Sequence, residues 1–431
     1  MAPARWLTPL LLLAAPLLAD EADDAVLVIR AGRVIPIAGA ELAPGTVVVR
    51  GGKVEAVGRR VEVPPGARVL DLPDSTVMPG LIGPRSRFGL GPAYDRGGNH
   101  ADLSAAAEVD PAPARFRPLL AAGYVCAGLV PAGSGIPGRA VGLRPGGGEA
   151  ELLPAAGYLR VRFASLPGDK VALRSALDAA KLAIEREENA RKAWEEKQKQ
   201  AAAPRSGETA PVASPAPAAS TAPVASFVPP AVAPELVPFM ALLRGKDAPR
   251  VVVEVARASD LVHLEEVWSR VPASTRPAAI LLELGNFTDL HLAVERLGKA
   301  KALVVCPPRV ALEVHTRNRR NLPLELHRAG ATVALLPYDD SAAGHARTLE
   351  AAALLVRDGL PREVALAGLT RAAAAVLGLP DLGTIEPGKR ADLLVLDGDP
   401  LLPGTRVERV LLAGQEAWRR GAEEEDGDEA E

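Results

Sequence analysis

Two arginines, Arg85 and Arg87, stand two residues apart just after the apolar segment Val77 to Gly83. A guanidinium carries five hydrogen-bond donors and no acceptor and stays protonated at physiological pH, so it cannot ligate a metal ion and would repel one. The same planar group binds carboxylates and phosphates through two parallel hydrogen bonds. The pair therefore favours recognition of an anion over metal chemistry.

Alternating strand-like and helix-like segments fill the middle of the chain and must position these arginines. Apolar runs such as Val251 to Val255 and Ala279 to Leu284 are each followed by a helical stretch. This alternation predicts an α/β core with parallel strands. Spacing alone leaves open whether the sheet is doubly wound or closed into an eight-stranded barrel.

Short β-branched runs broken by glycine occur near both ends of the chain. Val47 to Gly58 has the pattern of a hairpin whose turn lies at Gly51 and Gly52, where positive φ is needed. Ala391 to Leu396 and Val407 to Leu412 have the same character. We expect one small β domain assembled from both ends.

A long insertion interrupts the alternation. Apolar residues at helical spacing between 173 and 184 lead into Glu185 to Gln200, which carries charges on nearly all sides and predicts a helix that projects into solvent. Residues 201–234 consist mainly of Ala, Pro, Ser, Thr and Val, a composition that is typical of a disordered linker.

The two ends predict different things. Residues 1–19 combine one arginine with an apolar run and a small residue before an acidic stretch, which predicts a signal peptide and a secreted or periplasmic protein. An uncleaved anchor or a buried helix is the alternative. No later stretch reaches the roughly 20 apolar residues of a membrane span. Residues 421–431 are acidic and predict a solvated tail, with an interaction tail as the alternative.

Composition excludes several classes of protein. With a net charge of −3 and 3% aromatic residues, the chain offers neither the basic face nor the stacking surface that nucleic-acid binding uses. Two cysteines, Cys126 and Cys306, exclude a disulfide framework and a cysteine-rich zinc site. A single bridge stays open, although both lie in apolar runs and we expect buried thiols.

Three blocks of the sequence resemble the amidohydrolase superfamily, in particular its secreted, imidazolonepropionase-like members. They are 47–90, with Val-Met-Pro-Gly-Leu-Ile at 77–82; 123–138; and 369–400, with Gly-Thr-Ile-Glu-Pro-Gly-Lys-Arg-Ala-Asp-Leu at 383–393, which is similar to the G-x-I-x-x-G-x-x-A-D-L hallmark. The resemblance implies an α/β fold, a TIM-like (β/α)8 barrel with a small β-sandwich domain assembled from both termini. It also implies metal-dependent hydrolysis of non-peptide C–N bonds.

The resemblance sets the expected domains. We predict a signal peptide at 1–19, a β domain from 20–78 and 385–420, a barrel from 79–384 interrupted at 185–240 by the charged helix and linker, and an acidic tail at 421–431.

The family's metal ligands are replaced in this chain. The family carries H-x-H on the first barrel strand, a histidine on the fifth, often another on the sixth, and an aspartate on the eighth. The corresponding positions here are Arg85, Arg87, Glu254 and Tyr338, and the sixth-strand segment holds Glu283 but no histidine. A slip of one residue on the eighth strand would bring in Asp339. We therefore expect no cofactor.

None of the six histidines falls at a motif position. We expect His263, His291 and His327 on helices, and His100, His315 and His345 nearer the loops of the functional face.

These positions suggest what replaced the metal. Buried acidic groups without a cation are costly, so we hypothesise that Arg85 and Arg87 pair with Glu254, and Asp339 with them, at the barrel mouth. In the alternative, both arginines face solvent or a loop.

The leading hypothesis is a catalytically degenerate binding or scaffold protein, with weak catalytic candidates Asp339 and Glu254. Its partners would be a small anionic molecule bound by Arg85 and Arg87, an active paralogue, or a second copy of the chain. The alternative is an active hydrolase of cyclic amides or related small molecules, with a rearranged site of Glu254, Asp339 and a nearby histidine holding a divalent metal such as zinc.

Overall fold

The computed structural model describes residues 26–93, 97–110, 112–146, 148–164, 167–202, 226–283 and 287–422. The predicted signal peptide at 1–19, most of the predicted linker and nearly all of the predicted acidic tail lie outside these ranges. Within them, no helix combines the length and the apolar character that crossing a membrane requires.

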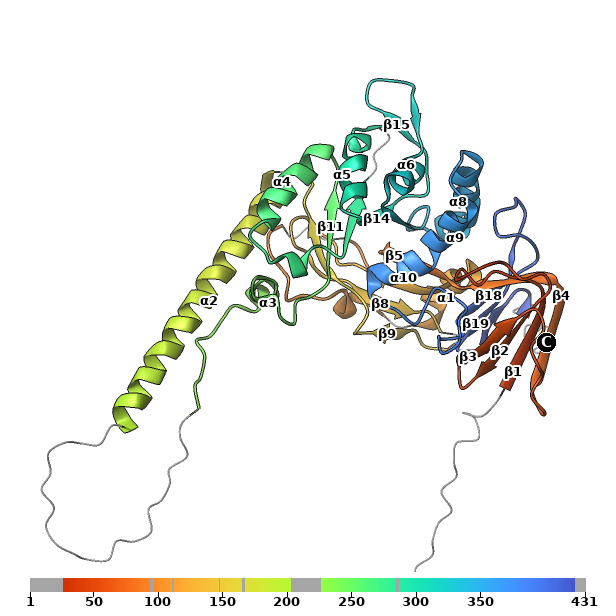
Figure 1. Cartoon of the computed structure of the whole chain (residues 1–431), viewed down its shortest axis with the longest axis horizontal. Helices are drawn as coiled ribbons and strands as arrows, with labels where there is room; N and C mark the ends of the chain where they lie inside the picture. Colours follow the sequence, from red (N-terminus) through yellow and green to blue (C-terminus); the bar gives the residue numbers. More distant parts are fainter. Residues whose placement is uncertain are drawn as a thin grey trace, which may run out of the picture.

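A seven-stranded sheet joins the two ends of the chain, at the right of Figure 1. Its order is β20 (Gln415–Arg419), β19 (Val407–Leu412), β18 (Leu393–Leu396), β4 (Arg68–Pro79), β1 (Val26–Val34), β2 (Gly45–Arg50) and β3 (Lys53–Gly58). Antiparallel pairing of β18 with β4 sets Leu393 opposite Pro79, so the late strands extend a sheet begun by the early ones. The prediction of one β unit built from both ends is confirmed, and its being a sandwich stays a prediction.

A second group of strands forms a parallel core. One sheet contains β17 (Thr332–Leu335), β14 (Leu303–Cys306), β12 (Ala279–Leu282), β11 (Val251–Val255) and β10 (Leu159–Arg162) in parallel, with β7 (Gly138–Arg139) antiparallel at its edge. A further sheet contains β5 (Leu81–Ser86) parallel to β6 (Tyr124–Leu129), then β8 (Val141–Arg144) and β9 (Glu151–Leu153). The strands β12, β14 and β17 are mainly aliphatic, as expected for parallel strands covered on both faces, whereas β10 alternates aliphatic residues with arginine.

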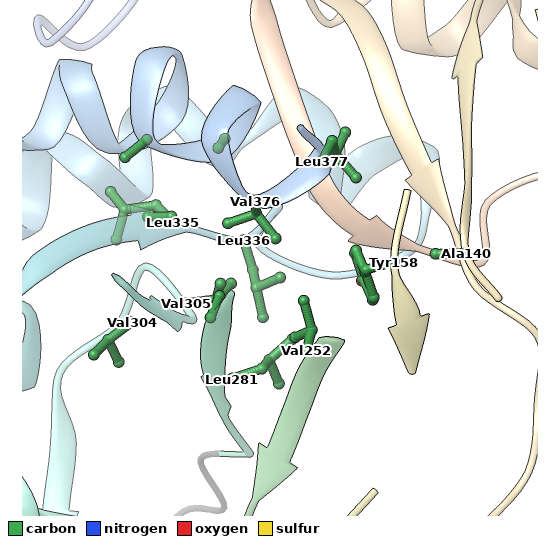
Figure 2. Packing of buried hydrophobic residues seen from close by; sticks show 14 of the residues in the cluster. Ala140, Tyr158, Val252, Leu281, Val304, Val305, Leu335, Leu336, Val376 and Leu377 are labelled. Atoms are coloured by element: carbon green, nitrogen blue, oxygen red, sulfur yellow. The ribbon is translucent and has the colours of Figure 1, made fainter. Parts of the chain in front are cut away.

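This arrangement is that of a TIM-like α/β fold. The two groups of strands remain separate sheets within the described residues, so their hydrogen bonds do not close a barrel there. Figure 2 shows how side chains from the strands, among them Val252, Leu281 and Val305, meet Val376 and Leu377 of the helix α10. This helix contacts both groups: Leu377 accepts a hydrogen bond from Gly157, just before β10, and a Cβ on Gly128 of β6 would lie 2.5 Å from its side chain.

Helices follow the strands of the core. They are α1 (Pro113–Ala121), α2 (Pro167–Ala202), α3 (Val237–Arg244), α4 (Ala258–Trp268), α5 (Val294–Lys299), α6 (Leu322–Ala329), α7 (Ala342–Ala346), α8 (Thr348–Arg357), α9 (Arg362–Leu369) and α10 (Arg371–Leu377). A small sheet of β13 (Phe287–Thr288), β15 (Ala311–Glu313) and β16 (Arg319–Arg320) lies outside the main core.

The charged insertion forms the 36-residue helix α2, which projects away from the body in Figure 1. The predicted solvent-projecting helix is therefore present, and its far part also has two neighbours from later in the chain. The ring of Trp194 lies 5.9 Å from that of Phe227, and Arg244 of α3 donates to Glu187 at 2.9 Å. The returning chain therefore packs along the helix.

Cys126 and Cys306 are buried and unbridged, so the expectation of buried thiols is confirmed. Burial raises the pKa of both thiols to about 12. Because the thiolate is the reactive form, neither side chain is suited to nucleophilic or metal-binding chemistry.

Candidate functional site: an arginine–glutamate cluster

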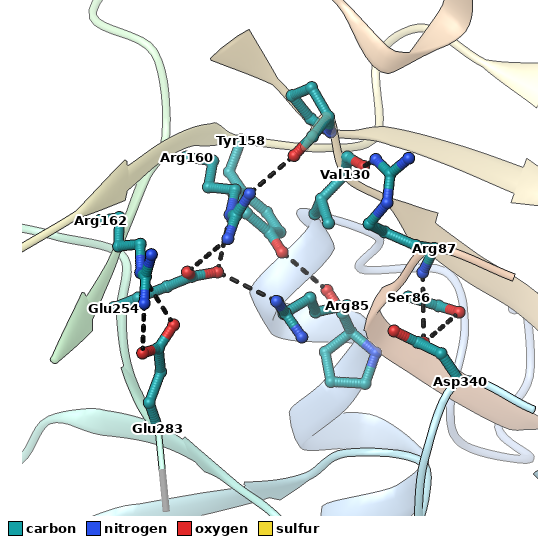
Figure 3. A network of polar contacts seen from close by, with 12 residues as sticks. Arg85, Ser86, Arg87, Val130, Tyr158, Arg160, Arg162, Glu254, Glu283 and Asp340 are labelled. Carbon is teal, nitrogen blue, oxygen red and sulfur yellow. Dashed lines mark hydrogen bonds and ion pairs between the residues drawn. The ribbon is translucent and has the colours of Figure 1, made fainter. Parts of the chain in front are cut away.

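Charged side chains gather where the parallel core strands end. Arg85 lies near the end of β5, Arg162 at the end of β10, Glu254 near the end of β11, and Glu283 directly after β12. The carboxyl ends of parallel strands meet at one edge, which is where barrels of this type place their functional residues. Figure 3 shows these side chains pointing toward one another.

Glu254 is the centre of this cluster. Its side chain is 0% exposed, and both of its oxygens accept hydrogen bonds from guanidinium groups. Arg160 donates from Nε to Oε1 at 2.8 Å and from Nη2 to Oε2 at 2.7 Å, while Arg85 donates from Nε to Oε1 at 3.1 Å. The predicted pairing of Arg85 with Glu254 is therefore present.

Electrostatics keep this carboxyl ionised. Burial alone would raise the pKa of Glu254, but the charges of Arg160 and then Arg85 outweigh burial and hold it well below its ordinary value. Glu254 is thus a carboxylate whose charge is already balanced by the protein.

Arg160 is the principal partner, and the sequence interpretation missed it. Its side chain is 5% exposed, and its Nη1 also donates to the carbonyl of Pro131 at 2.6 Å. The signal was present in β10, where Arg160 and Arg162 alternate with Leu159 and Val161 and so share one face. An arginine two residues before the end of a buried strand has to find an acidic partner.

A second ion pair borders the first. Arg162 and Glu283 approach at 3.3 Å, with side chains 30% and 26% exposed. Burial and the neighbouring charge of Glu254 raise the pKa of Glu283. Three guanidiniums, from Arg85, Arg160 and Arg162, thus meet two carboxyl groups, and the cluster carries an excess of positive charge.

Arg87 does not join the cluster, which corrects the prediction for this residue. Its guanidinium donates to the carbonyls of Val130 at 2.8 Å and Gly91 at 3.1 Å, and it pairs with Glu108 at 3.4 Å. The physical reason is that β5 ends at Ser86, so the two-residue repeat that puts alternate side chains on one face stops before Arg87.

Asp339 also lies outside the cluster, contrary to the hypothesis. Its carboxylate accepts hydrogen bonds from the backbone N–H of Ser341 at 2.8 Å and from its hydroxyl at 2.5 Å, and these bonds lower its pKa. Tyr338 is 39% exposed and carries the guanidinium of Arg347 at 4.9 Å from its ring centre. Asp339 thus caps the turn that precedes α7, and the side chain of Tyr338 contacts the residue that follows this helix.

The neighbouring Asp340, which the sequence interpretation did not single out, faces β5 instead. It accepts hydrogen bonds from the hydroxyl of the buried Ser86 at 2.7 Å and from the backbone N–H of Arg87 at 3.2 Å (Figure 3). These bonds tie the chain after β17 to the end of β5 and fix the direction in which Arg87 leaves the strand.

Of the three histidines expected near the functional face, His345 is the most buried, at 1% exposed. Its Nδ1 lies 2.8 Å from the carbonyl of Ser341, its ring packs against Tyr124 and Phe88, and burial lowers its pKa. His100 lies 3.2 Å from the carbonyl of Gly97, and His315 adopts a positive φ of 58°.

The three histidines that were expected on helices make contacts away from the arginine–glutamate cluster or lie at a helix end. His263 contacts Lys170 at 2.7 Å, His291 lies 3.4 Å from Glu313, and His327 is in the last turn of α6.

The residues at the motif positions do not suit the family's metal ion. Both oxygens of Glu254 are engaged by guanidiniums, whose positive charge would oppose a divalent cation. In the described part of the chain, no three side chains of His, Cys, Asp and Glu converge as a metal site would need. The chemistry that this arrangement offers is anion recognition through arginine.

Solved structures of amidohydrolases have a fold similar to that of this chain. The chain resembles an amidohydrolase from Thermotoga maritima MSB8 at 23% identity and a TM-score of 0.69, covering 91% of this chain and 100% of that one. A second solved amidohydrolase matches at 14% identity and a TM-score of 0.50, covering 92% of this chain and 100% of the other. No curated protein sequence matches the chain.

The model of the amidohydrolase family matches residues 271–421, which run from before β12 through β20. This stretch includes the parallel strands β12, β14 and β17 and the return into the seven-stranded sheet. Residues 271–421 are thus similar in sequence to the amidohydrolase family, and the chain as a whole shares its fold with a solved amidohydrolase.

Proposed function

We propose that this chain is a binding member of its superfamily that lacks metal-dependent hydrolysis and holds a small anionic molecule at the mouth of its core. The observation that carries the proposal is the engagement of both oxygens of Glu254 by Arg160 and Arg85. In the family, the residue at this position is a metal ligand. Here the oxygens of Glu254 are bound by guanidinium groups instead.

Arg85 is the residue that would contact the ligand. Its side chain is 25% exposed, and only Nε is bonded to Glu254, while neither terminal nitrogen has a hydrogen-bond partner in the described part of the chain. Two parallel N–H groups facing solvent suit a carboxylate or a phosphate. The excess positive charge of the cluster adds a longer-range attraction for anions.

Arg160 would act as the support of this site. It is 5% exposed and bonded to Glu254 and to the Pro131 carbonyl, so it neutralises Glu254 without reaching solvent. This support leaves Arg85 free to exchange part of its interaction with Glu254 for one with a ligand. Because residues 1–19 have the pattern of a signal peptide, we propose that the protein acts outside the cytoplasm.

Two measurements on the full chain test the proposal. Isothermal titration with acetate and with inorganic phosphate should detect binding of at least one probe, and Arg85→Met should weaken it by about tenfold, as loss of a bidentate charged contact predicts. Arg115→Met is the matched control, because Arg115 is also a partly exposed arginine but pairs with Asp110 away from the cluster. Equal binding by both variants would refute the role of Arg85.

Metal analysis separates this function from the active-hydrolase alternative. We expect no stoichiometric zinc, iron or manganese after purification in the presence of each metal. Stoichiometric metal, together with hydrolysis of cyclic amides or dipeptides that Glu254→Ala abolishes, would overturn the binding-protein proposal.

A further inference from the structure

A cavity of about 720 Å³ lies between α4 and α5. Its apolar wall includes Leu261 and Leu264 of α4, Leu297 of α5 and Ile280 of β12. In the ladder between β11 and β12, Glu254 is the register partner of Leu281, so the side chain of Ile280 points to the opposite face of the sheet. The cavity is therefore separate from the arginine–glutamate cluster.

The packing of α5 leaves this space open. Gly298 of α5 lies so close to α6 that a Cβ on it would come within 2.2 Å of the Ala329 carbonyl oxygen, so α5 is seated against α6. The lining also includes small residues that cannot fill the space between α4 and α5. These are Ala273, Ala278, Ala300 and Ala302.

Basic side chains edge the apolar wall. The lining includes Arg276, Arg296 and Lys301 and one acidic residue, Glu265, which pairs with Arg296. Neither Arg276 nor Lys301 has a side-chain hydrogen bond or ion pair in the described ranges, and both residues are exposed. The edge thus carries two positive charges without acidic partners.

The backbone at Lys301 is also unusual. Its φ is 48°, in the left-handed region that a chain leaving a helix normally assigns to glycine. The lysine places a positive charge directly after α5, beside the cavity.

We propose that this cavity binds a long-chain carboxylate, with the alkyl chain against Leu264, Leu297 and Ile280 and the carboxylate at Arg276 and Lys301. The volume falls within the roughly 300–1,000 Å³ of small-molecule sites, and an apolar wall with a few charged groups at the edge is their usual composition. A neutral apolar ligand would leave both cations unused, and a short anion would leave the wall exposed to water. An anionic amphiphile satisfies both parts.

The test is calorimetric titration of the full chain with dodecanoate below its micelle concentration. We expect a tight site for dodecanoate that is distinct from carboxylate binding at the arginine–glutamate cluster and for which acetate does not compete. Dodecyltrimethylammonium should bind this site more weakly than dodecanoate. The double variant Arg276→Glu/Lys301→Glu should weaken dodecanoate binding by about tenfold or more, because both cationic partners become repulsive. Both substitutions are on exposed side chains and leave the packed core untouched.

Two further variants complete the test. Lys299→Glu reverses one charge at the end of α5, but Lys299 is 81% exposed and does not line the cavity, so binding should stay within about twofold. Ala278→Phe places a ring in the cavity and should block dodecanoate.

Absence of dodecanoate binding to the wild-type chain would overturn the proposal. So would equal affinity of the wild type and the double variant, or displacement of dodecanoate by acetate.

Discussion

Replacing Arg160 by methionine tests the energetics of the cluster most directly. The change removes two hydrogen bonds to Glu254, at 2.8 and 2.7 Å, and those to the carbonyls of Pro131 and Gly133, while Met fills much of the same volume. Hydrogen bonds to charged groups contribute about 1.5–3 kcal/mol each, so the two to Glu254 amount to about 3–6 kcal/mol. Because Arg85 still donates at 3.1 Å, we expect the lower part of that range, about 3–4 kcal/mol at pH 7.

The cost should depend on pH with a definite sign. In the wild type the pKa of Glu254 in the folded state is lowered, so its contribution to stability is present above the ordinary pKa of about 4.3 and is lost as pH falls through the folded-state value. In Arg160→Met, burial is opposed mainly by Arg85, and the carboxyl protonates more readily. The deficit relative to wild type should therefore shrink as pH falls from 7 toward 4.

Equilibrium urea unfolding of the full chain, followed by tryptophan fluorescence and circular dichroism, measures this deficit. Arg174→Met is the control, because Arg174 forms an exposed pair with Glu266 and should cost no more than about 0.5 kcal/mol. Glu254→Gln combined with Arg160→Met should cost at least about 2 kcal/mol less than the sum of the single variants. A loss below about 1 kcal/mol in Arg160→Met, or a deficit that does not change with pH, would refute the reasoning.

Three further predictions use the same unfolding assay. Gly298→Ala should cost about 1–3 kcal/mol because the added Cβ meets the Ala329 backbone, whereas Gly168→Ala, with no atom within 4 Å of its Cβ, should not destabilise; equal effects would contradict this. Asp392→Asn should cost about 2–4 kcal/mol, since its side chain is 1% exposed and pairs with Arg390 at 3.0 Å; a loss under 0.5 kcal/mol, roughly that of a surface change, would count against it.

The third concerns Asp399. Burial tends to raise its pKa, but the hydrogen bond from Arg362 and the other bonds to this carboxylate outweigh burial and lower it. Its contribution should be present above the ordinary pKa of about 3.9 and lost as pH falls through the folded-state value, so the difference from Asp399→Asn should disappear in acid. A difference that stays constant throughout the acid range in which the protein remains folded would argue against it.

The sequence by itself determined the architecture. Aliphatic runs such as Val251 to Val253 and Ala279 to Leu282 are typical of buried strands, and glycine-punctuated runs near both ends predicted a shared sheet, because these patterns depend on local spacing. The exchange of family ligands at Arg85 and Glu254 was likewise visible along the chain. The pairing of Arg85 with Glu254 could also be predicted, because an unpaired buried charge is costly.

Only the tertiary structure decided which arginines enter the cluster. Arg87 lies outside the cluster because β5 ends one residue before it. Arg160 belongs to the cluster because the parallel register of β10 with β11 places residue 162 beside Glu254 and residue 160 close enough to bond to it. The cavity between α4 and α5 depends equally on the contact of Gly298 with Ala329, 31 residues away in sequence. Strand ends, register and helix seating are set by packing between distant segments, and no local pattern in the sequence encodes them.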